Sequence, residues 1–247
     1  MSGAAKGAAP IRAALARLGC DRRIAAPGEV IAAAGEAPGR VGLILGGWLY
    51  HLRTEPDGRR QITDLMTAGD LVAPGFPCGA APGLAAYALT RAELCEFEGE
   101  SLLRASNADP ELRLWLMALM QRQRRRLEAR LVDLGLRSGS ERAARALVEI
   151  AMREGTGRPP ARSLDLSLPL SLRFFGELLG LSTAHVCRIF KDFERRDVAH
   201  YETGRVRIHD FERLMRLGNV TPAELATFAA SAAAPPDLPP ETCAEAR

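Results

Sequence analysis

The chain has 247 residues, of which 47% are hydrophobic and 26% are charged, so it can bury one large core or two modest ones. This composition excludes a wholly disordered chain. The sequence holds no run of about 18 apolar residues, and its first ten residues lack the basic and apolar pattern of a secretion signal. We therefore expect a cytoplasmic protein that does not span a membrane.

The formal net charge is only +3, but the charges are distributed unevenly along the chain. Residues 1–107 carry 11 basic and 11 acidic side chains, whereas residues 137–216 carry 15 basic against 11 acidic ones. A local excess of positive charge indicates the part of a chain that contacts a polyanion such as nucleic acid.

Between Ile24 and Phe97, short β-prone runs alternate with Gly, Pro and Asp, a pattern that predicts an antiparallel sandwich or barrel. The clearest hairpin joins residues 48–53 to residues 61–66, because Asp57 and Gly58 supply turn geometry between them. The other predicted strands cover residues 29–31, 41–45, 71–72, 85–89 and 93–97. We assign residues 1–107 to this sensor-like β domain.

A long helix is predicted over residues 108–136, because Asp109 and Pro110 can begin a helix and Gly135 can end one. About 25 helical residues, at 1.5 Å each, give a rod of nearly 40 Å. Its stripe at steps of three and four consists of Leu112, Leu116, Leu119, Gln123, Leu127, Leu131 and Leu134. This stripe predicts a dimer interface of the coiled-coil type, and packing of the helix on its own sandwich remains the alternative.

Residues 172–198 have the pattern of a helix-turn-helix. Two short amphipathic runs flank the turn at residues 180–182, with apolar side chains at spacings of one, three or four. Gly176 is small where the two helices would cross, Gly180 can adopt the positive φ of a sharp turn, and Ser182 can cap the second helix. The pattern predicts a DNA-binding unit.

The surroundings of this unit fit a winged helix over residues 137–228. A helix is predicted over residues 141–153, and residues 200–208 read as a hairpin that turns at Thr203 and Gly204, with Arg205 beside the turn. From residue 229 to residue 247 the chain is mostly Ala, Pro and acidic residues, which predicts a disordered tail. The expected fold class is α+β: an antiparallel sandwich or jelly roll, a long dimerisation helix and a winged helix-turn-helix.

In this order of parts, the chain resembles the CRP/FNR family of bacterial transcription regulators over residues 24–217. The strongest match is Gly180-Leu181-Ser182-Thr183-Ala184-His185-Val186-Cys187-Arg188, which is close to the family's Gly-Leu-Ser/Thr-x-x-x-Val-x-Arg. Residues 57–62 and 68–72 match the family's sandwich. The resemblance implies a cyclic-nucleotide-binding-like domain, a homodimer that binds an inverted repeat in double-stranded DNA, and either activation or repression. RNA polymerase would be a further partner of an activator.

The family's DNA contacts can be carried over by position. Arg188 matches the base-reading arginine, whose guanidinium can bind O6 and N7 of guanine with two hydrogen bonds. Thr183, Ala184 and Cys187 occupy the other base-facing positions, where many members have Glu in place of Ala184 and Ser or Gly in place of Cys187. Without that glutamate the preferred half-site differs, because no carboxylate accepts a hydrogen bond from cytosine.

Further positions match contacts that orient the helix on the DNA without reading its sequence. Ser182, His185 and Lys191 match phosphate-contacting positions, and Thr203, Gly204 and Arg205 form the expected wing.

The sensor-like domain departs from the family's cyclic-nucleotide pattern. Its first element reads Gly69-Asp70 where the family has Gly-Glu, and no Arg or Lys occurs between Arg60 and Arg91 to match a buried phosphate. We therefore expect a regulator that does not depend on cAMP, and no cofactor or metal.

Other effectors find little support in the sequence. Cys20, Cys78 and Cys95 are too few and too widely spaced for an iron–sulfur cluster, which needs about four thiolates. His51 or Cys78 could ligate a haem, but a lone His on a strand is more often an ordinary surface residue.

The five cysteines, which also include Cys187 and Cys243, are scattered and odd in number. No spacing indicates a disulfide framework or a zinc site, so we expect reduced thiols. Cys187 would lie at the DNA surface beside Arg188, where positive charge favours a thiolate and oxidation would add bulk or charge. The alternative is that Cys187 only replaces a small residue and packs against a thymine methyl group.

Two other classes of protein fit the sequence less well. A metal-dependent cupin enzyme would need several histidines in the sandwich, and only His51 lies there, so we expect no enzyme. A haem-sensing or small-molecule-sensing module with a purely structural helical part is the alternative function, and the wing and the local positive charge argue against it.

Overall fold

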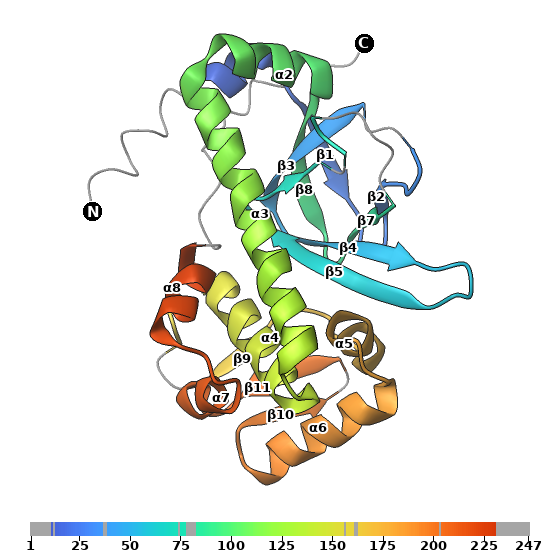
Figure 1. Ribbon diagram of the computed structural model, residues 1–247, viewed down its shortest axis with the longest axis vertical. Helices are drawn as coiled ribbons and strands as arrows, with labels where there is room; N and C mark the ends of the chain where they lie inside the picture. The colour runs from blue at the N-terminus through green and yellow to red at the C-terminus, as the bar shows by residue number, and fades with distance from the viewer. Residues whose placement is uncertain are drawn as a thin grey trace. The chain divides into compact units, whose positions relative to one another are not determined.

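The computed structural model describes residues 11, 13–36, 39–73, 75–77, 83–155, 157–160, 163–202 and 204–230. The described residues form two compact units (Figure 1). Residues up to 52 and residues 65–125 make the first unit, and residues 53–64 together with residues 126–230 make the second.

The first unit contains the predicted antiparallel sandwich, which is confirmed (Figure 1). One four-stranded sheet has the order β1-β8-β3-β6, made of Asp21–Ala25, Ala92–Glu98, Arg40–Gly46 and Leu71–Val72. The other has the order β2-β7-β4-β5, made of Val30–Ala32, Ala85–Ala88, Trp48–Thr54 and Arg60–Thr67. Strand β1, which was not predicted, pairs with β8 from Asp21 opposite Glu96 to Ala25 opposite Ala92.

The central strands β3 and β8 of the first sheet bury side chains on both faces, and successive side chains of a strand point to opposite faces. Ile44 and Leu94 belong to the cluster between the two sheets. Their neighbours Leu43 and Cys95 belong to a second cluster, in which helical residues cover the sheet. We call this second cluster the helix-side core.

Two helices follow the sandwich, α2 at Gly99–Ala108 and α3 at Pro110–Leu136. The predicted start of α3 is confirmed, because the carboxylate of Asp109 accepts hydrogen bonds from the backbone N–H groups of Glu111 (3.0 Å) and Leu112 (3.2 Å). Helix α2 was not predicted.

The stripe along α3 is divided between two environments, which corrects the prediction of one continuous dimer interface. Leu112, Leu116 and Leu119 are buried in the helix-side core of their own chain, so they are not available to a second copy. The later stripe residues remain exposed: Leu127 by 42%, Leu131 by 71% and Leu134 by 39%. Further exposed apolar side chains on α3 are Leu114, Met117, Met120, Val132 and Leu136.

The expectation that all cysteines are reduced is wrong, because Cys20 and Cys95 form a disulfide. Their Cα atoms lie 5.5 Å apart although 75 positions separate them in the sequence. Pairing of β1 with β8 brings them together, and this long-range pairing could not be inferred from the spacing of the cysteines. Cys78 and Cys243 lie outside the described residues.

The second unit contains the predicted winged helix-turn-helix. Its helices are α4 at Gly139–Glu154, α5 at Leu172–Leu179, α6 at Thr183–Arg195, α7 at Phe211–Leu217 and α8 at Pro222–Ala230. Its sheet has the order β10-β11-β9, made of Ala199–Glu202, Arg205–Ile208 and Leu164–Leu166.

The wing hairpin is confirmed as β10 and β11, whereas β9 was not predicted. Residues 229 and 230 of the predicted tail are the last residues of α8, and residues 231–247 lie outside the described residues.

A buried arginine ties three parts of the second unit together. Arg145 of α4 lies 2.8 Å from the carboxylate of Asp133 in α3 and donates a hydrogen bond of 2.6 Å to Glu224 in α8. It also donates to the carbonyl oxygen of Gly218, at 3.2 Å. Burial raises the pKa of Asp133 despite the nearby arginines. Burial acts in the same direction on Glu224, but hydrogen bonds from Arg145 and Thr221 outweigh it and lower the pKa to about 2.

This pKa predicts loss of α8 contacts in acid. A carboxyl group whose pKa falls from 4.5 to about 2 on folding stabilises the folded state above pH 4.5, and this stabilisation disappears as the pH falls from 4.5 towards 2. Between pH 5.5 and pH 3.5, we expect hydrogen-exchange protection of α8 amides, corrected for intrinsic rates, to fall on the order of tenfold more in the wild type than in Glu224→Gln. Equal decreases in the two proteins would contradict this role of Glu224.

Candidate nucleic-acid interface

The turn between α5 and α6 depends on two glycines. Gly180 ends α5 in the left-handed conformation, with φ +65° and ψ +41°. A Cβ at Gly176 would lie 2.7 Å from the carbonyl oxygen of Leu181, so only glycine permits this close approach of the backbone. The same two residues are joined by a backbone hydrogen bond, in which the N–H of Leu181 donates to the carbonyl oxygen of Gly176 at 3.0 Å. Both glycines therefore have the roles that the sequence predicted.

Serine side chains begin both helices. The hydroxyl of Ser171 accepts a hydrogen bond from the N–H of Phe174 at 3.0 Å, and that of Ser182 accepts one from the N–H of His185 at 3.3 Å. Each bond satisfies one of the unpaired donors at a helix start. The starting residue of α6 is thus fixed, and with it the direction in which each later side chain points.

The inner face of α6 anchors it to the rest of the unit. Val186, Ile189, Phe190 and Phe193 are buried. The ring of Phe190 lies 5.0 Å from that of Phe175 in α5 and 5.1 Å from that of Tyr201 in β10, measured between ring centroids. Aromatic contacts therefore join both helices of the motif to the wing. The role of Tyr201 could not be predicted from the sequence, because the four-residue wing strand is too short to show a clear alternation of apolar residues.

The outer face of α6 presents the predicted contact residues to solvent. Thr183, Ala184, Arg188 and Lys191 are exposed, and Cys187 is half-buried between them. Positions 184, 188 and 191 lie on one side of the helix, because they are three and four residues apart. Among the described residues, neither Arg188 nor Lys191 takes part in an ion pair, so the structure leaves both cations available to a polyanion.

The predicted phosphate-contacting residues Ser182 and His185 lie at the start of α6 and are exposed. A Cβ at Gly139 would lie 3.3 Å from Nε2 of His185, which places this imidazole over the first residue of α4. The structure thus brings Ser182 and His185 together through the helix cap, and it places Lys191 two turns further along α6.

The wing residues are only partly described. Thr203 lies outside the described residues, Gly204 has a φ of +82°, and Arg205 is exposed. Arg207 on the same strand donates to Asp165 of β9 at 2.6 Å, and this hydrogen bond raises the pKa of Arg207 and lowers that of Asp165. The charge of Arg207 is therefore already balanced, whereas Arg205 points to solvent beside the turn.

The turn at Gly69 and Asp70 in the sensor-like domain contains a buried carboxylate. Asp70 is buried, and its carboxylate accepts a hydrogen bond of 3.1 Å from the N–H of Thr67. Arg122 of α3 donates to the carbonyl oxygen of Gly69 at 2.6 Å and lies 3.8 Å from Asp70. Arg122 therefore already faces a carboxylate at this turn.

The other candidate ligand residues are not gathered into a site. His51 is buried in β4 rather than on the surface, and Cys20 and Cys95 are joined to each other. In the described part of the chain, no group of three or more His, Cys, Asp or Glu side chains could hold a metal ion. None of the described helices is long and apolar enough to cross a membrane.

Known protein families match both units. Residues 22–109 match the model of the cyclic nucleotide-binding domain, and residues 141–217 match that of the Crp-like helix-turn-helix domain.

Individual relatives agree with these matches. The chain is 29% identical to the nitrogen fixation regulation protein FixK of Azorhizobium caulinodans over 65% of its own length and 64% of that protein's length, which is slightly less than two thirds. It is 31% identical to a "Probable transcriptional activator" of Rhizobium leguminosarum bv. viciae over 79% of its own length and 80% of the relative's.

A solved structure shows the same fold. The structure of FixK2 from Bradyrhizobium japonicum superposes with a TM-score of 0.70 and 25% identity, and the match covers 80% of this chain and 96% of that one. The recognition geometry of α5 and α6, both domain models and the relative from Rhizobium leguminosarum lead to one conclusion: the chain belongs to the CRP/FNR family of DNA-binding transcription regulators.

Proposed function

We propose that two copies of this chain bind an inverted repeat in double-stranded DNA, each inserting α6 into a major groove. The observation that carries the proposal is the exposed outer face of α6, on which Arg188 and Lys191 have no ion-pair partner among the described residues. Arg188, Thr183, Ala184 and Cys187 contact bases. Two half-sites then lie about one helical turn, roughly 34 Å, apart.

In this proposal, contacts to phosphates position the helix. Ser182, His185 and Lys191 provide them from α6, and the wing at Thr203, Gly204 and Arg205 provides them from the second hairpin. Such contacts fix orientation and carry little sequence information. The protein acts where the chromosome is, in the cytoplasm, and as an activator it would also contact RNA polymerase.

Dimerisation uses the exposed part of α3. Leu127, Leu131 and Leu134 of the predicted stripe are exposed together with Leu114 and Met117, and a second copy of α3 offers the matching apolar surface. Gln123 lies between the buried and the exposed leucines of the stripe. Domains assigned as residues 1–107, 108–136 and 137–228 then act as sensor, dimer helix and DNA reader.

Cyclic nucleotides are not the effector in this proposal, because Asp70 and Arg122 already face each other at the turn where the family holds a phosphate. A signal received by the sandwich acts by changing the relative orientation of the two α6 helices, since only orientations that match the groove spacing bind tightly.

Arg188→Ala tests the base contact. We expect the affinity for the selected operator to fall by about 1–3 kcal/mol, that is roughly 5- to 150-fold, with little change on random DNA. Lys191→Ala is the matched control. It should weaken binding to both DNAs alike and lower the slope of log affinity against log salt concentration by about one. An unchanged ratio of specific to non-specific affinity in Arg188→Ala would remove Arg188 from base recognition.

Leu131→Asp tests the dimer. A charge at this 71% exposed position leaves the fold of the monomer intact but places carboxylates in the helix–helix seam. Light scattering should show a monomer, and operator affinity should fall at least about 100-fold, because a single half-site remains. Ile24→Asp, which changes a 59% exposed apolar residue on β1, should remain dimeric. A dimeric Leu131→Asp protein would contradict the proposed interface.

Peroxide treatment tests Cys187 as a redox-sensitive contact. Cys187 is half-buried beside Arg188, so a sulfenate there adds charge and volume in the groove. Both proteins carry Cys20→Ser/Cys95→Ser, so that no other described cysteine reacts. Peroxide should then weaken operator binding of the protein that retains Cys187 and leave the protein with Cys187→Ser unaffected. Equal weakening of both proteins would leave Cys187 only a packing role.

A further inference from the structure

The disulfide between Cys20 and Cys95 lies in an unusual place for a protein of this class. A regulator that binds DNA shares a compartment in which thiols are kept reduced, and the disulfides found there are usually transient or redox-sensing. This step rests on the proposed function. The Cα separation of 5.5 Å is ordinary for a disulfide, so the two sulfur atoms can bond without a rearrangement of the backbone.

The two cysteines differ in their burial and in their position relative to the sheet. Cys95 is fully buried in β8, which has a neighbouring strand on each side. Cys20 is 5% exposed and precedes β1, the edge strand of the sheet. Gly19, with a φ of +67°, separates Cys20 from the helical residues 13–18. The disulfide therefore joins the centre of the sheet to the end of a short helical segment.

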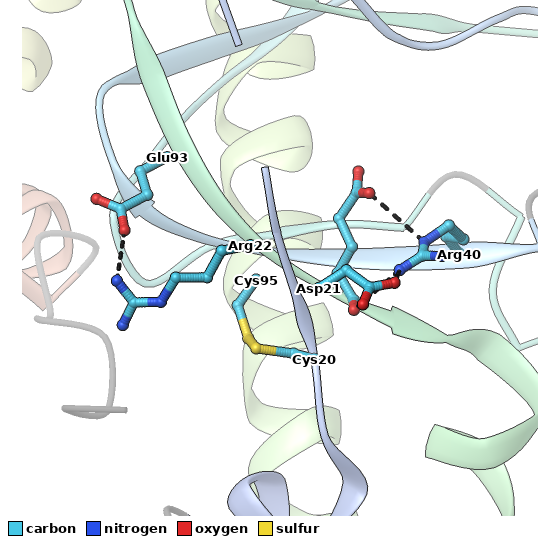
Figure 2. The surroundings of a disulfide bond; sticks show 7 residues. Cys20, Asp21, Arg22, Arg40, Glu93 and Cys95 are labelled. Atoms are coloured by element: carbon cyan, nitrogen blue, oxygen red, sulfur yellow. Dashed lines mark hydrogen bonds and ion pairs between the residues drawn. A yellow bond between two sulfur atoms is a disulfide. The ribbon is translucent and has the colours of Figure 1, made fainter. Parts of the chain in front are cut away.

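Strand β1 does not depend on the disulfide for its position. Figure 2 shows ion pairs on both sides of the sulfur atoms, from Arg22 to Glu93 at 2.7 Å and from Arg40 to Asp21. Arg40 also lies 3.5 Å from Glu96. Together with the strand pairing of β1 and β8, these contacts keep β1 on the sheet whether the sulfur atoms are bonded or not.

Apolar packing holds the helical residues 13–18, which precede β1. Ala14 and Leu15 are buried in the helix-side core, and so are both cysteines. The same core contains Leu112, Leu116 and Leu119, which anchor the first part of α3. Among the interactions described here, apolar packing in this core and the disulfide hold residues 13–18 next to the leucines of α3.

We propose that Cys20 and Cys95 form a reversible redox site that fastens residues 13–18 over the base of α3 when it is oxidised. Hydrogen peroxide converts the Cys20 thiol to a sulfenic acid with release of one water. The Cys95 thiol then attacks that sulfur, the S–S bond forms, and a second water leaves with the proton. A cellular dithiol reverses the step and is itself oxidised to a disulfide, so electrons balance in both directions.

The first experiment follows the thiols in the full chain carrying Cys187→Ser. The protein is reduced with dithiothreitol, desalted and divided, and one half receives a stoichiometric amount of hydrogen peroxide. Both halves are denatured and treated with N-ethylmaleimide before peptide mass mapping. We expect the Cys20 and Cys95 peptides to carry the label in the reduced half and to be cross-linked in the oxidised half. Labelled Cys20 and Cys95 in both halves would overturn the proposal.

The second experiment follows the packing. Hydrogen exchange of residues 13–18 and of the first turns of α3 should be on the order of tenfold faster in the reduced protein than in the oxidised one. The double variant Cys20→Ser/Cys95→Ser should exchange at the fast rate under both conditions. Identical exchange in the oxidised and reduced proteins would overturn the proposed fastening.

Operator binding, measured on the same samples, separates this proposal from the proposed function. The thiol and exchange measurements need no DNA, so a failure to bind any operator in either state counts against the DNA-binding proposal alone. A redox difference in exchange that is also present in Cys20→Ser/Cys95→Ser would count against the cysteine pair alone.

Discussion

The sheet β1-β8-β3-β6 must be covered on both faces, and much of the first unit follows from that requirement. Strand alternation sends Leu94 and Ile44 towards the second sheet, and it sends Leu43 and Cys95 the opposite way. Helical residues cover much of that opposite face, so the first leucines of α3 are used inside the chain. What remains of the apolar stripe lies further along the helix and is exposed.

The second unit separates support from recognition on a single helix. The inner face of α6 is buried against α5 and the wing through Phe190, and the Arg145 network joins α4 to α8. None of these contacts uses Thr183, Ala184 or Arg188. Because these side chains are exposed and the fold makes no demand on them, residues on the outer face of α6 can differ with little cost in stability.

Local patterns in the sequence were sufficient to predict much of the architecture. The turn at Gly180, the cap at Ser182 and the start of α3 at Asp109 each depend on residues that are close together in the chain, and the structure confirms all three. The features that the sequence did not predict depend on residues that are far apart in the chain. The disulfide and the contact of Arg122 with Gly69 join distant segments, and the burial of Leu112 depends on which face of a sheet needs a cover.

The two proposals for cysteine oxidation differ in how oxidation would affect DNA binding. In the proposed complex an oxidised Cys187 would act directly, because it would stand among the proposed base-contacting residues and obstruct the groove. The Cys20–Cys95 pair can act only through packing, because both sulfur atoms are buried in the helix-side core beneath α3. Direct obstruction can only weaken DNA binding, whereas a change in how the base of α3 is held can act in either direction. A gain of operator affinity on oxidation in Cys187→Ser would therefore assign the effect to the buried pair.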